Sequence, residues 1–218
     1  MSEENIDIKI CEDPNAEVER KFKIVVIGDP YVGKTNLIQR FINNTFIKDS
    51  KPTYHATFTS KKFIINNELF TFEIWDGANS RIQSHAGCEL KLARGVLLLY
   101  DATNESSFDS IEGRYSVIKE RARNGVIVIL VGTKIDLKDR IVVNSEMSQK
   151  QANSLNIEVF ETSALDSTNV QEVFLTLIKK MYQFMKSEEK QFTEHTENNE
   201  PIVQLNVEPQ KTKNKCIK

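Results

Sequence analysis

The chain has 218 residues, 29 of them Lys or Arg and 31 Asp or Glu, which gives a formal net charge of −2. This length fits one domain with a tail, and the charge gives no overall attraction to nucleic acid, so we expect no nucleic-acid partner. Three scattered cysteines without metal-ligand spacing favour reduced thiols in a cytosolic protein over a disulfide framework. The apolar runs are too short to span a bilayer, and the acidic N-terminus does not resemble a signal peptide.

The hydrophobic pattern predicts strands that alternate with helices along the chain. The expected strands are residues 22–27, 58–65, 68–75, 95–100, 126–131 and 157–162, and the expected helices are residues 35–43, 108–124, 145–156 and 170–186. Two of these strands, 95–100 and 126–131, are continuously apolar, as in strands that are buried on both faces. The alternation predicts an α/β fold with a mostly parallel sheet that helices cover on both faces.

Composition divides the chain into three parts. Residues 1–20 are polar and acidic, and we expect a flexible N-terminal extension there. Residues 21–186 carry the alternating elements and form the predicted domain. Residues 187–218 are rich in Glu, Asn and Lys and show little periodicity, which predicts a disordered, hypervariable tail.

Residues 28–35 read Gly-Asp-Pro-Tyr-Val-Gly-Lys-Thr and follow an apolar strand directly. This is the G-x-x-x-x-G-K-[ST] pattern of a phosphate-binding loop, in its usual place between a strand and a helix. Glycines let the loop backbone turn so that its amides face a polyphosphate. Lys34 can reach the β- and γ-phosphates, and the Thr35 hydroxyl can bind Mg²⁺. The pattern therefore predicts a nucleoside triphosphate site, and the alternative is a chance match in a glycine-containing turn.

Further motifs follow the loop in order, and together they resemble the small GTPases of the Ras superfamily, closest to the Rab branch. Thr53 lies eighteen residues after Thr35, where that family has its switch I threonine. Trp75-Asp76 stands where the family has Trp-Asp-Thr-Ala-Gly. Residues 131–136 (Val-Gly-Thr-Lys-Ile-Asp) and 161–164 (Glu-Thr-Ser-Ala) resemble the two halves of the guanine-reading motif. The resemblance covers residues 21–186 and implies a six-stranded, mostly parallel sheet with one antiparallel strand.

The resemblance implies a role for each motif residue in binding GTP or GDP. Asp136 would accept hydrogen bonds from the guanine N1–H and 2-amino group, a pattern that adenine lacks. Lys134 would pack over the purine, and the Ala164 amide would meet O6. Most relatives have Asn at the position of Thr133, but the Rho branch has Thr there, followed later by Ser-Ala-Leu as in this chain. The implied nucleotide-binding residues are Gly28, Asp29, Tyr31, Val32, Gly33, Lys34, Thr35, Asn36, Thr53, Asn79, Thr133, Lys134, Asp136, Ser163, Ala164 and Leu165.

The same resemblance implies a magnesium site and a conformational switch. Thr35 and Thr53 would bind Mg²⁺ directly, and Asp76 would hold it through water. Lys34 and Thr53 are the implied catalytic residues. Loss of the γ-phosphate would release the loop that contains Thr53, unless Thr53 is an ordinary loop residue. Phe58 and Trp75 resemble members of the family's effector-contacting patch, although buried hairpin aromatics would give the same pattern.

One motif departs from the family. Its switch II reads Asp-x-x-Gly-Gln, where the glutamine orients the attacking water, but residues 76–81 here read Asp-Gly-Ala-Asn-Ser-Arg. Asn79 keeps a backbone N–H for the γ-phosphate, whereas Ser80 is too short to replace the glutamine. Pro30 and Tyr31 also add bulk to the phosphate loop. We therefore expect slow GTP hydrolysis, and the alternative is that Arg81 or Gln83 positions the water.

The C-terminal end carries one candidate site of modification. Cys216 is third from the end, so it does not fit the C-a-a-X rule, but it lies among lysines as in some prenylated Rab tails. The alternative is a plain basic end. The Rab resemblance implies a switch in vesicle trafficking, cytoplasmic or on the cytosolic face of endomembranes, with effectors, an exchange factor and a GTPase-activating protein as partners. The rival hypotheses are a pseudo-GTPase scaffold and an unrelated phosphate-loop kinase or ATPase, against which Asp136 argues.

Overall fold

The structure of the chain is a computed structural model that describes residues 6–13, 15–16, 20–48, 53, 57–77 and 90–197. Two compact units are distinguished, one that ends at Phe184 and one that begins at Met185. The first unit contains the sheet, the helices that pack on it and the candidate site. In the second unit, only the end of the last helix lies in the described part of the chain.

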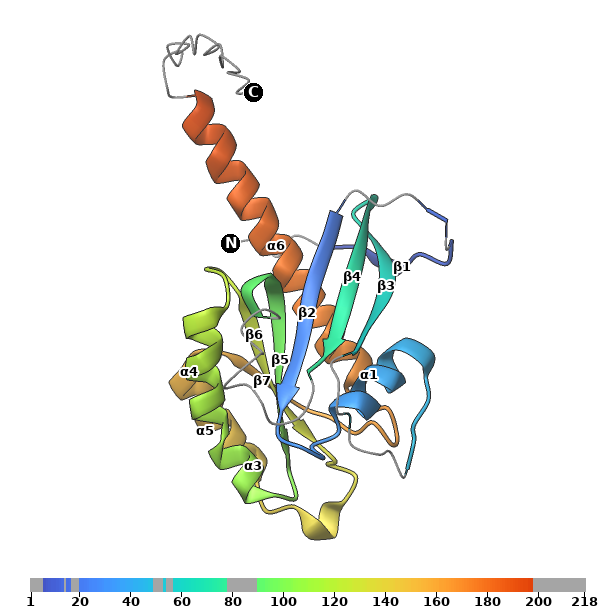
Figure 1. Cartoon of the computed structure of the whole chain (residues 1–218), viewed down its shortest axis with the longest axis vertical. Helices are drawn as coiled ribbons and strands as arrows, with labels where there is room; N and C mark the ends of the chain where they lie inside the picture. The colour runs from blue at the N-terminus through green and yellow to red at the C-terminus, as the bar shows by residue number, and fades with distance from the viewer. Residues whose placement is uncertain are drawn as a thin grey trace, which may run out of the picture. The chain divides into compact units, whose positions relative to one another are not determined.

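A seven-stranded sheet forms the centre of the first unit (Figure 1), with the strand order β1-β3-β4-β2-β5-β6-β7 among the described residues. The strands are β1 (Ile8–Ile10), β2 (Arg20–Gly28), β3 (Thr57–Ile65), β4 (Glu68–Asp76), β5 (Ala93–Asp101), β6 (Ile127–Thr133) and β7 (Glu158–Glu161). β4, β2, β5, β6 and β7 run parallel, whereas β3 is antiparallel to β4. The predicted α/β fold with a mostly parallel sheet is confirmed.

The seventh strand, β1, lies in the segment for which the sequence predicted a flexible extension. It pairs antiparallel with β3, so that Ile8 is opposite Ile65 and Ile10 is opposite Phe63. Backbone hydrogen bonds continue the pairing at both ends, from Cys11 N to Lys62 O at 3.0 Å and from Asn66 N to Asp7 O at 3.0 Å. Three residues in a polar segment are too few for alternating hydrophobicity to reveal a strand.

The α-helices of the described residues are α1 (Lys34–Asn43), α3 (Glu105–Asp109), α4 (Ile111–Arg121), α5 (Ser145–Leu155) and α6 (Val170–Glu197), and a short 3-10 helix, η1, spans Lys138–Arg140. The single helix expected over residues 108–124 is two helices that meet at Ser110, whose hydroxyl donates to Ser107 O at 2.9 Å. α6 continues past the expected end at residue 186. The part of the expected tail that follows residue 186 is rich in Glu, which has high helix propensity, and this explains the extension.

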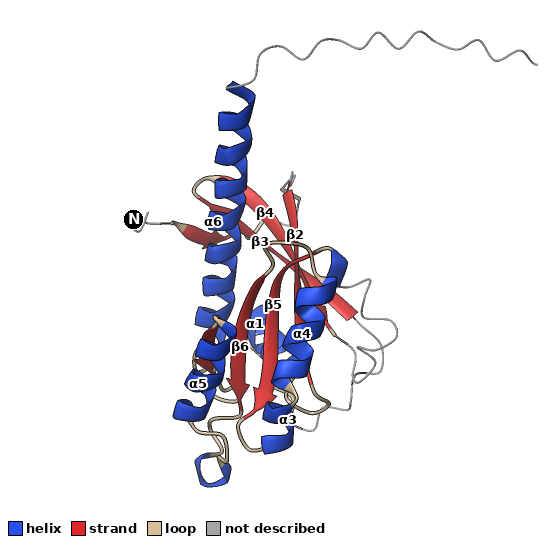
Figure 2. Cartoon of the chain, turned by 90° about the vertical axis from the view of Figure 1, so that its left-hand side faces the viewer, coloured by secondary structure: helices blue, strands red, loops and turns tan. Residues whose placement is uncertain are grey.

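One face of the sheet packs against α4 and α5. Its buried cluster joins strand residues such as Leu98 and Leu130 to Ile111 and Ile118 of α4 and Ala152 of α5. Figure 2 shows α4 on one side of β5 and β6, and the part of α6 that precedes Met185 on the other. Both faces are therefore covered, as the near-continuous apolar strands predict.

The other face is closed by α1 and α6 through a column of aromatic rings. Phe41 of α1 stacks on Phe174 of α6 with ring centroids 4.0 Å apart, and it also stacks on Phe63 of β3 at 6.2 Å. Phe63 in turn meets Phe72 of β4 edge-on at 5.7 Å. These contacts fix α1 against the sheet, and the N-terminus of α1 faces the ends of the parallel strands, where ligands bind in α/β folds (Figure 1).

We predict that Phe41→Ala lowers the free energy of unfolding by about 3–5 kcal/mol, because it removes a buried ring that stacks on two others. Urea denaturation followed by circular dichroism measures this change. Leu92→Ala is the control, since Leu92 is 72% exposed, and it should cost less than about 0.5 kcal/mol. Equal effects of the two substitutions would show that α1 does not depend on the aromatic column.

Candidate functional site

The phosphate loop connects β2 to α1 at the carboxyl edge of the sheet. A Cβ atom on Gly28 would lie 2.6 Å from Leu99 O, so only glycine lets the end of β2 approach β5 this closely. Gly33 at the N-cap of α1 has a φ of 97°, a left-handed conformation that favours glycine. Tyr31 also has a positive φ, 66°, and its side chain is exposed. The loop thus leads into the N-terminus of α1, and the first N–H groups of a helix are suited to binding an anion.

Lys34 lies under this loop and is buried, with an exposed fraction of 5%. Its Nζ donates to Gly28 O at 3.0 Å and to Asp29 O at 2.8 Å. Burial lowers the pKa of Lys34 to about 8, although the nearby Asp76 carboxylate acts in the opposite direction. A cation held in this way gains favourable charge interactions when a polyphosphate binds to the loop.

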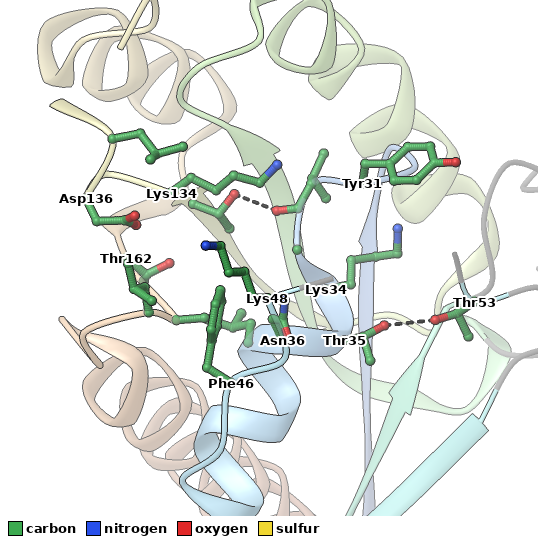
Figure 3. A pocket seen from close by; sticks show the side chains of 17 residues that line it. Tyr31, Lys34, Thr35, Asn36, Phe46, Lys48, Thr53, Lys134, Asp136 and Thr162 are labelled. Atoms are coloured by element: carbon green, nitrogen blue, oxygen red, sulfur yellow. Dashed lines mark hydrogen bonds between the residues drawn. The ribbon is translucent and has the colours of Figure 1, made fainter. Parts of the chain in front are cut away.

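Two hydroxyls and a carboxylate meet beside Lys34. Thr35 Oγ1 donates to Asp76 Oδ2 at 2.5 Å and lies 2.9 Å from Thr53 Oγ1 (Figure 3). Asp76 is 4% exposed, and its other oxygen, Oδ1, has no hydrogen-bond partner among the described residues. Burial raises the pKa of Asp76, against the hydrogen bond from Thr35. A buried carboxylate oxygen without a partner, next to two hydroxyls, fits the oxygen ligands that Mg²⁺ prefers.

The start of the loop is tied to α4 by an ion pair that the sequence analysis did not predict. The Asp29 carboxylate accepts from the Arg114 guanidinium, and the Ser110 hydroxyl donates to the same carboxylate oxygen at 3.3 Å. Both charged side chains are largely buried. The Asp29 side chain therefore connects the start of the loop to α4, and Asp29 is not among the residues that line the cavity.

Thr133 ties the middle of the loop to the sheet. Its Oγ1 lies 2.6 Å from Val32 O and 2.9 Å from Tyr100 O, so one hydroxyl proton is shared between a loop carbonyl and a carbonyl of β5. Thr133 itself is the last residue of β6 and is buried. The short threonine side chain thus connects the phosphate loop to two strands.

A second group of polar residues lies beyond Thr133. Asp136 Oδ1 accepts a hydrogen bond from the buried Ser163 hydroxyl at 2.7 Å. Lys134 has a positive φ of 61°, and its Nζ pairs with Asp101 Oδ2 at 2.7 Å. Thr162 N donates to Gly132 O at 2.7 Å, which joins the segment after β7 to β6. These bonds fix the carboxylate of Asp136 at the cavity.

A cavity of about 530 Å³ connects the two groups. Figure 3 shows Thr35 and Thr53 at one end and Asp136 and Thr162 at the other. The predicted site residues that line the cavity are Tyr31, Val32, Gly33, Lys34, Thr35, Asn36, Thr53, Thr133, Lys134, Asp136, Ala164 and Leu165. Ser163 and Asp76 support it through hydrogen bonds, and Gly28 supports it by packing. Two predicted residues, Asn79 and Cys216, lie outside the described residues.

Phe46 and Lys48 also line the cavity, and the sequence did not predict them; Figure 3 shows them beside Asn36, between Asp136 and Thr35. Asn36 of α1 holds their segment, because its side chain donates to Ile47 O and accepts from Ile47 N, both at 3.1 Å. Neither residue belongs to a recognisable motif. The two hydrogen bonds between the Asn36 side chain and the backbone of Ile47 could not be predicted from the sequence, because no pattern links residues eleven positions apart.

Comparison with known proteins assigns the family. The family model described as "Ras family" matches residues 23–183. A Ras-related protein RABA4d from Arabidopsis thaliana is 36% identical over 174 residues, which cover 79% of this chain and 78% of the relative. The chain belongs to the Ras family.

Two further relatives place this Ras-family chain close to the Rab branch. GTP-binding protein ypt3 from Schizosaccharomyces pombe is 34% identical over 78% of this chain and 80% of the relative. Ras-related protein Rab-11C from Dictyostelium discoideum is 34% identical over 84% of this chain and 82% of the relative. Within the described part of this Ras-family chain, no helix combines the length and the apolar character that a membrane span requires.

We predict that Thr133→Ala destabilises this Ras-family protein by about 1–2 kcal/mol, because it removes the hydroxyl that Val32 O and Tyr100 O share. Release of guanine nucleotide should also become faster, since the phosphate loop loses its tie to β6. Urea denaturation and stopped-flow release of a fluorescent nucleotide measure the two effects. Thr133→Ser keeps the hydroxyl and should behave like the wild type in both measurements, and a Ser variant as impaired as the Ala variant would contradict the role of the hydroxyl.

Proposed function

We propose that the chain is a Rab-like small GTP-binding protein that acts as a GTP/GDP switch in vesicle trafficking. The observation that carries the proposal is that one cavity has Lys34 and Thr35 at one end and Asp136 at the other. A nucleotide needs a cation and hydroxyls at one end of its site for the polyphosphate, and a hydrogen-bond acceptor at the other end for the guanine base. The family match and relatives named as Rab and GTP-binding proteins support this reading.

We propose that Asp136 binds the guanine N1–H and 2-amino group, with its carboxylate oriented by the Ser163 hydroxyl. Lys134 would contribute its stem to the purine face. The Ala164 amide would donate to guanine O6. Adenine offers the carboxylate no matching donors, so a buried acceptor would be left without a partner and the wrong base would be rejected.

The phosphates would be bound by the amides of residues 31–35 and by Lys34. Mg²⁺ would be held by the hydroxyls of Thr35 and Thr53, with Asp76 acting through water. The Asp76 oxygen without a partner supports this assignment. When bound, the metal would neutralise charge on the β- and γ-phosphates. Lys34 would stabilise the same charge, and Thr53 would make the loop around it sensitive to the presence of the γ-phosphate.

Slow hydrolysis is the finer part of the proposal. The family places a glutamine where Ser80 stands, and a serine hydroxyl cannot reach as far to orient water. Residues 78–89 lie outside the described residues, so this inference rests on the sequence alone. The alternative is a pseudo-GTPase scaffold or binding module, which would not turn over nucleotide.

We propose effectors, an exchange factor and a GTPase-activating protein as partners. Phe58 is 60% exposed and stacks on Trp75 with ring centroids 5.0 Å apart, which supports an effector contact at this end of β3 and β4. Residues 21–186 would form the GTP-binding domain, to whose sheet β1 of the N-terminal segment adds an outer strand. Prenylation of Cys216 would bring the protein to the cytosolic face of endomembranes, and intact-mass analysis of protein from its native cell would test it.

Nucleotide binding is the first test. Purified protein should carry guanine nucleotide, and GTP and GDP should displace a fluorescent guanine nucleotide where a large excess of ATP does not. Displacement by ATP at a similar concentration would favour an unrelated phosphate-loop enzyme and would contradict the proposal. Protein that binds no nucleotide would contradict the switch altogether.

Single-turnover hydrolysis is the second test. We expect GTP hydrolysis at least about tenfold slower than that of the fission yeast relative ypt3 measured in parallel, because the water-orienting side chain is absent. Ser80→Gln should raise the rate. A wild-type rate equal to that of ypt3 would mean that another group, such as Arg81 or Gln83, positions the water.

Magnesium dependence is the third test. We predict that Asp76→Asn weakens GTP binding in the presence of Mg²⁺ by roughly tenfold to a hundredfold, as for other groups that orient metal ligands, because the neutral amide no longer attracts the hydrated cation. The two proteins should differ much less in EDTA. Glu73→Gln removes a carboxylate from the same strand outside the cavity, and it should leave the magnesium effect unchanged.

A further inference from the structure

The loop that follows β7 is held by one arginine of α1. Arg40 Nε donates to Ala164 O at 2.7 Å, and Arg40 Nη2 donates to Leu165 O at 3.0 Å. These carbonyls lie 124 and 125 residues away in sequence. A guanidinium has five N–H donors in a planar fork, so it can bind two successive carbonyls at once and fix the direction of the peptide between them.

The third arm of the fork fixes Arg40 itself. Its Nη1 donates to the backbone oxygen of Asn44 at 2.8 Å and to Asn44 Oδ1 at 3.1 Å. Asn44 is the C-cap of α1. The guanidinium is therefore held by its own helix on one side and holds the loop on the other. Hydrogen bonds to a charged donor are stronger than neutral ones, which makes the connection stiff.

Different residues hold the two base-reading groups. Ser163 donates to the Asp136 carboxylate, whereas Arg40 fixes the peptide at Ala164 and Leu165, and both of these residues line the cavity. Loss of one support should therefore disturb one part of base recognition and leave the other in place. This separation makes the role of Arg40 measurable.

We propose that Arg40 is a positioning residue for base specificity: its bonds to the carbonyls of Ala164 and Leu165 hold Ala164 in place, so that the N–H of the same residue reads the 6-carbonyl of guanine. The proposal rests on the proposed function, since it concerns the same nucleotide site. α1 carries Lys34 and Thr35 at its start and Arg40 six residues after Lys34, so one helix sets the spacing between the phosphate end and the base end. Arg40 thereby couples the reading of the base to the position of the phosphates.

Two nucleotide analogues separate the two base contacts. 6-Thio-GDP keeps the N1–H and the 2-amino group but replaces the 6-carbonyl with a weaker acceptor. IDP keeps the 6-carbonyl but lacks the 2-amino group. Affinities of GDP, 6-thio-GDP and IDP are measured by competition against a fluorescent GDP for each protein. For the wild type we expect GDP to bind roughly tenfold more tightly than either analogue, the value of about one hydrogen bond.

In Arg40→Ala, the preference for GDP over 6-thio-GDP should fall to about twofold or less, because the amide that reads position 6 is no longer held. The preference for GDP over IDP should remain at the wild-type value. Arg40→Lys keeps the positive charge but lacks the planar fork of donors, so it should lose most of the preference for GDP over 6-thio-GDP. This variant replaces Arg40→Ala in the experiment if the alanine variant does not fold. Asn44→Gly removes one bond to the guanidinium, tolerates the left-handed φ of 53° and should match the wild type.

Three results would overturn the proposal. The first is an unchanged preference for GDP over 6-thio-GDP in both Arg40 variants. The second is an equal loss of both preferences, which would mean that Arg40 only stabilises the fold. The third is a wild-type protein that binds GDP and prefers it to IDP but not to 6-thio-GDP, because position 6 would then be unread. A wild type that does not bind GDP, or that does not prefer it to IDP, would instead contradict the proposed function.

Discussion

The packing of Phe41 between Phe174 and Phe63 determines where α1 lies, and three parts of the cavity depend on that helix. Its first residues, Lys34 and Thr35, line one end of the cavity, where we propose that the phosphates bind. Other side chains of α1 hold segments that have no regular structure of their own, Asn36 the segment around Ile47 and Arg40 the loop at Ala164 and Leu165. A shift of α1 would therefore move all three parts of the cavity together. The aromatic rings that hold α1 against the sheet thus also hold the cavity in shape.

The two ends of the cavity are held by different groups. At one end, Ser163 donates to the Asp136 carboxylate, and Asp101 pairs with Lys134. At the other end, the Thr53 hydroxyl lies 2.9 Å from Thr35 Oγ1. Burial raises the pKa of Asp76, against hydrogen bonds from Thr35 and Thr53. Thr53 is therefore held by Thr35 and Asp76, the two residues that we propose to hold Mg²⁺ together with it.

Local motifs were predictable from the sequence, and contacts between distant residues were not. The phosphate loop, Asp76 and Asp136 belong to short patterns whose chemistry is readable in a few residues. The Arg114–Asp29 pair joins residues 85 positions apart, and no periodicity links them. Helix α6 was predicted too short because apolar periodicity ends before helix propensity does. The fold class followed from alternating strands and helices, whereas β1 was too short to detect.

The strand β1 also determines how the sheet ends. With β1 in place, the two outermost strands, β1 and β7, have three and four residues, and short outer strands offer little backbone for another chain to join. Without β1, β3 would be the edge strand of the sheet. Its backbone N–H and C=O groups around Phe63 and Ile65 would then be unpaired and close to large apolar side chains. Removal of the residues that form β1 should therefore leave the core of the GTP-binding domain unchanged. The shortened protein should, however, aggregate more readily through the exposed edge of β3. For this chain, the polar N-terminal segment thus covers the backbone of β3 at one edge of the sheet.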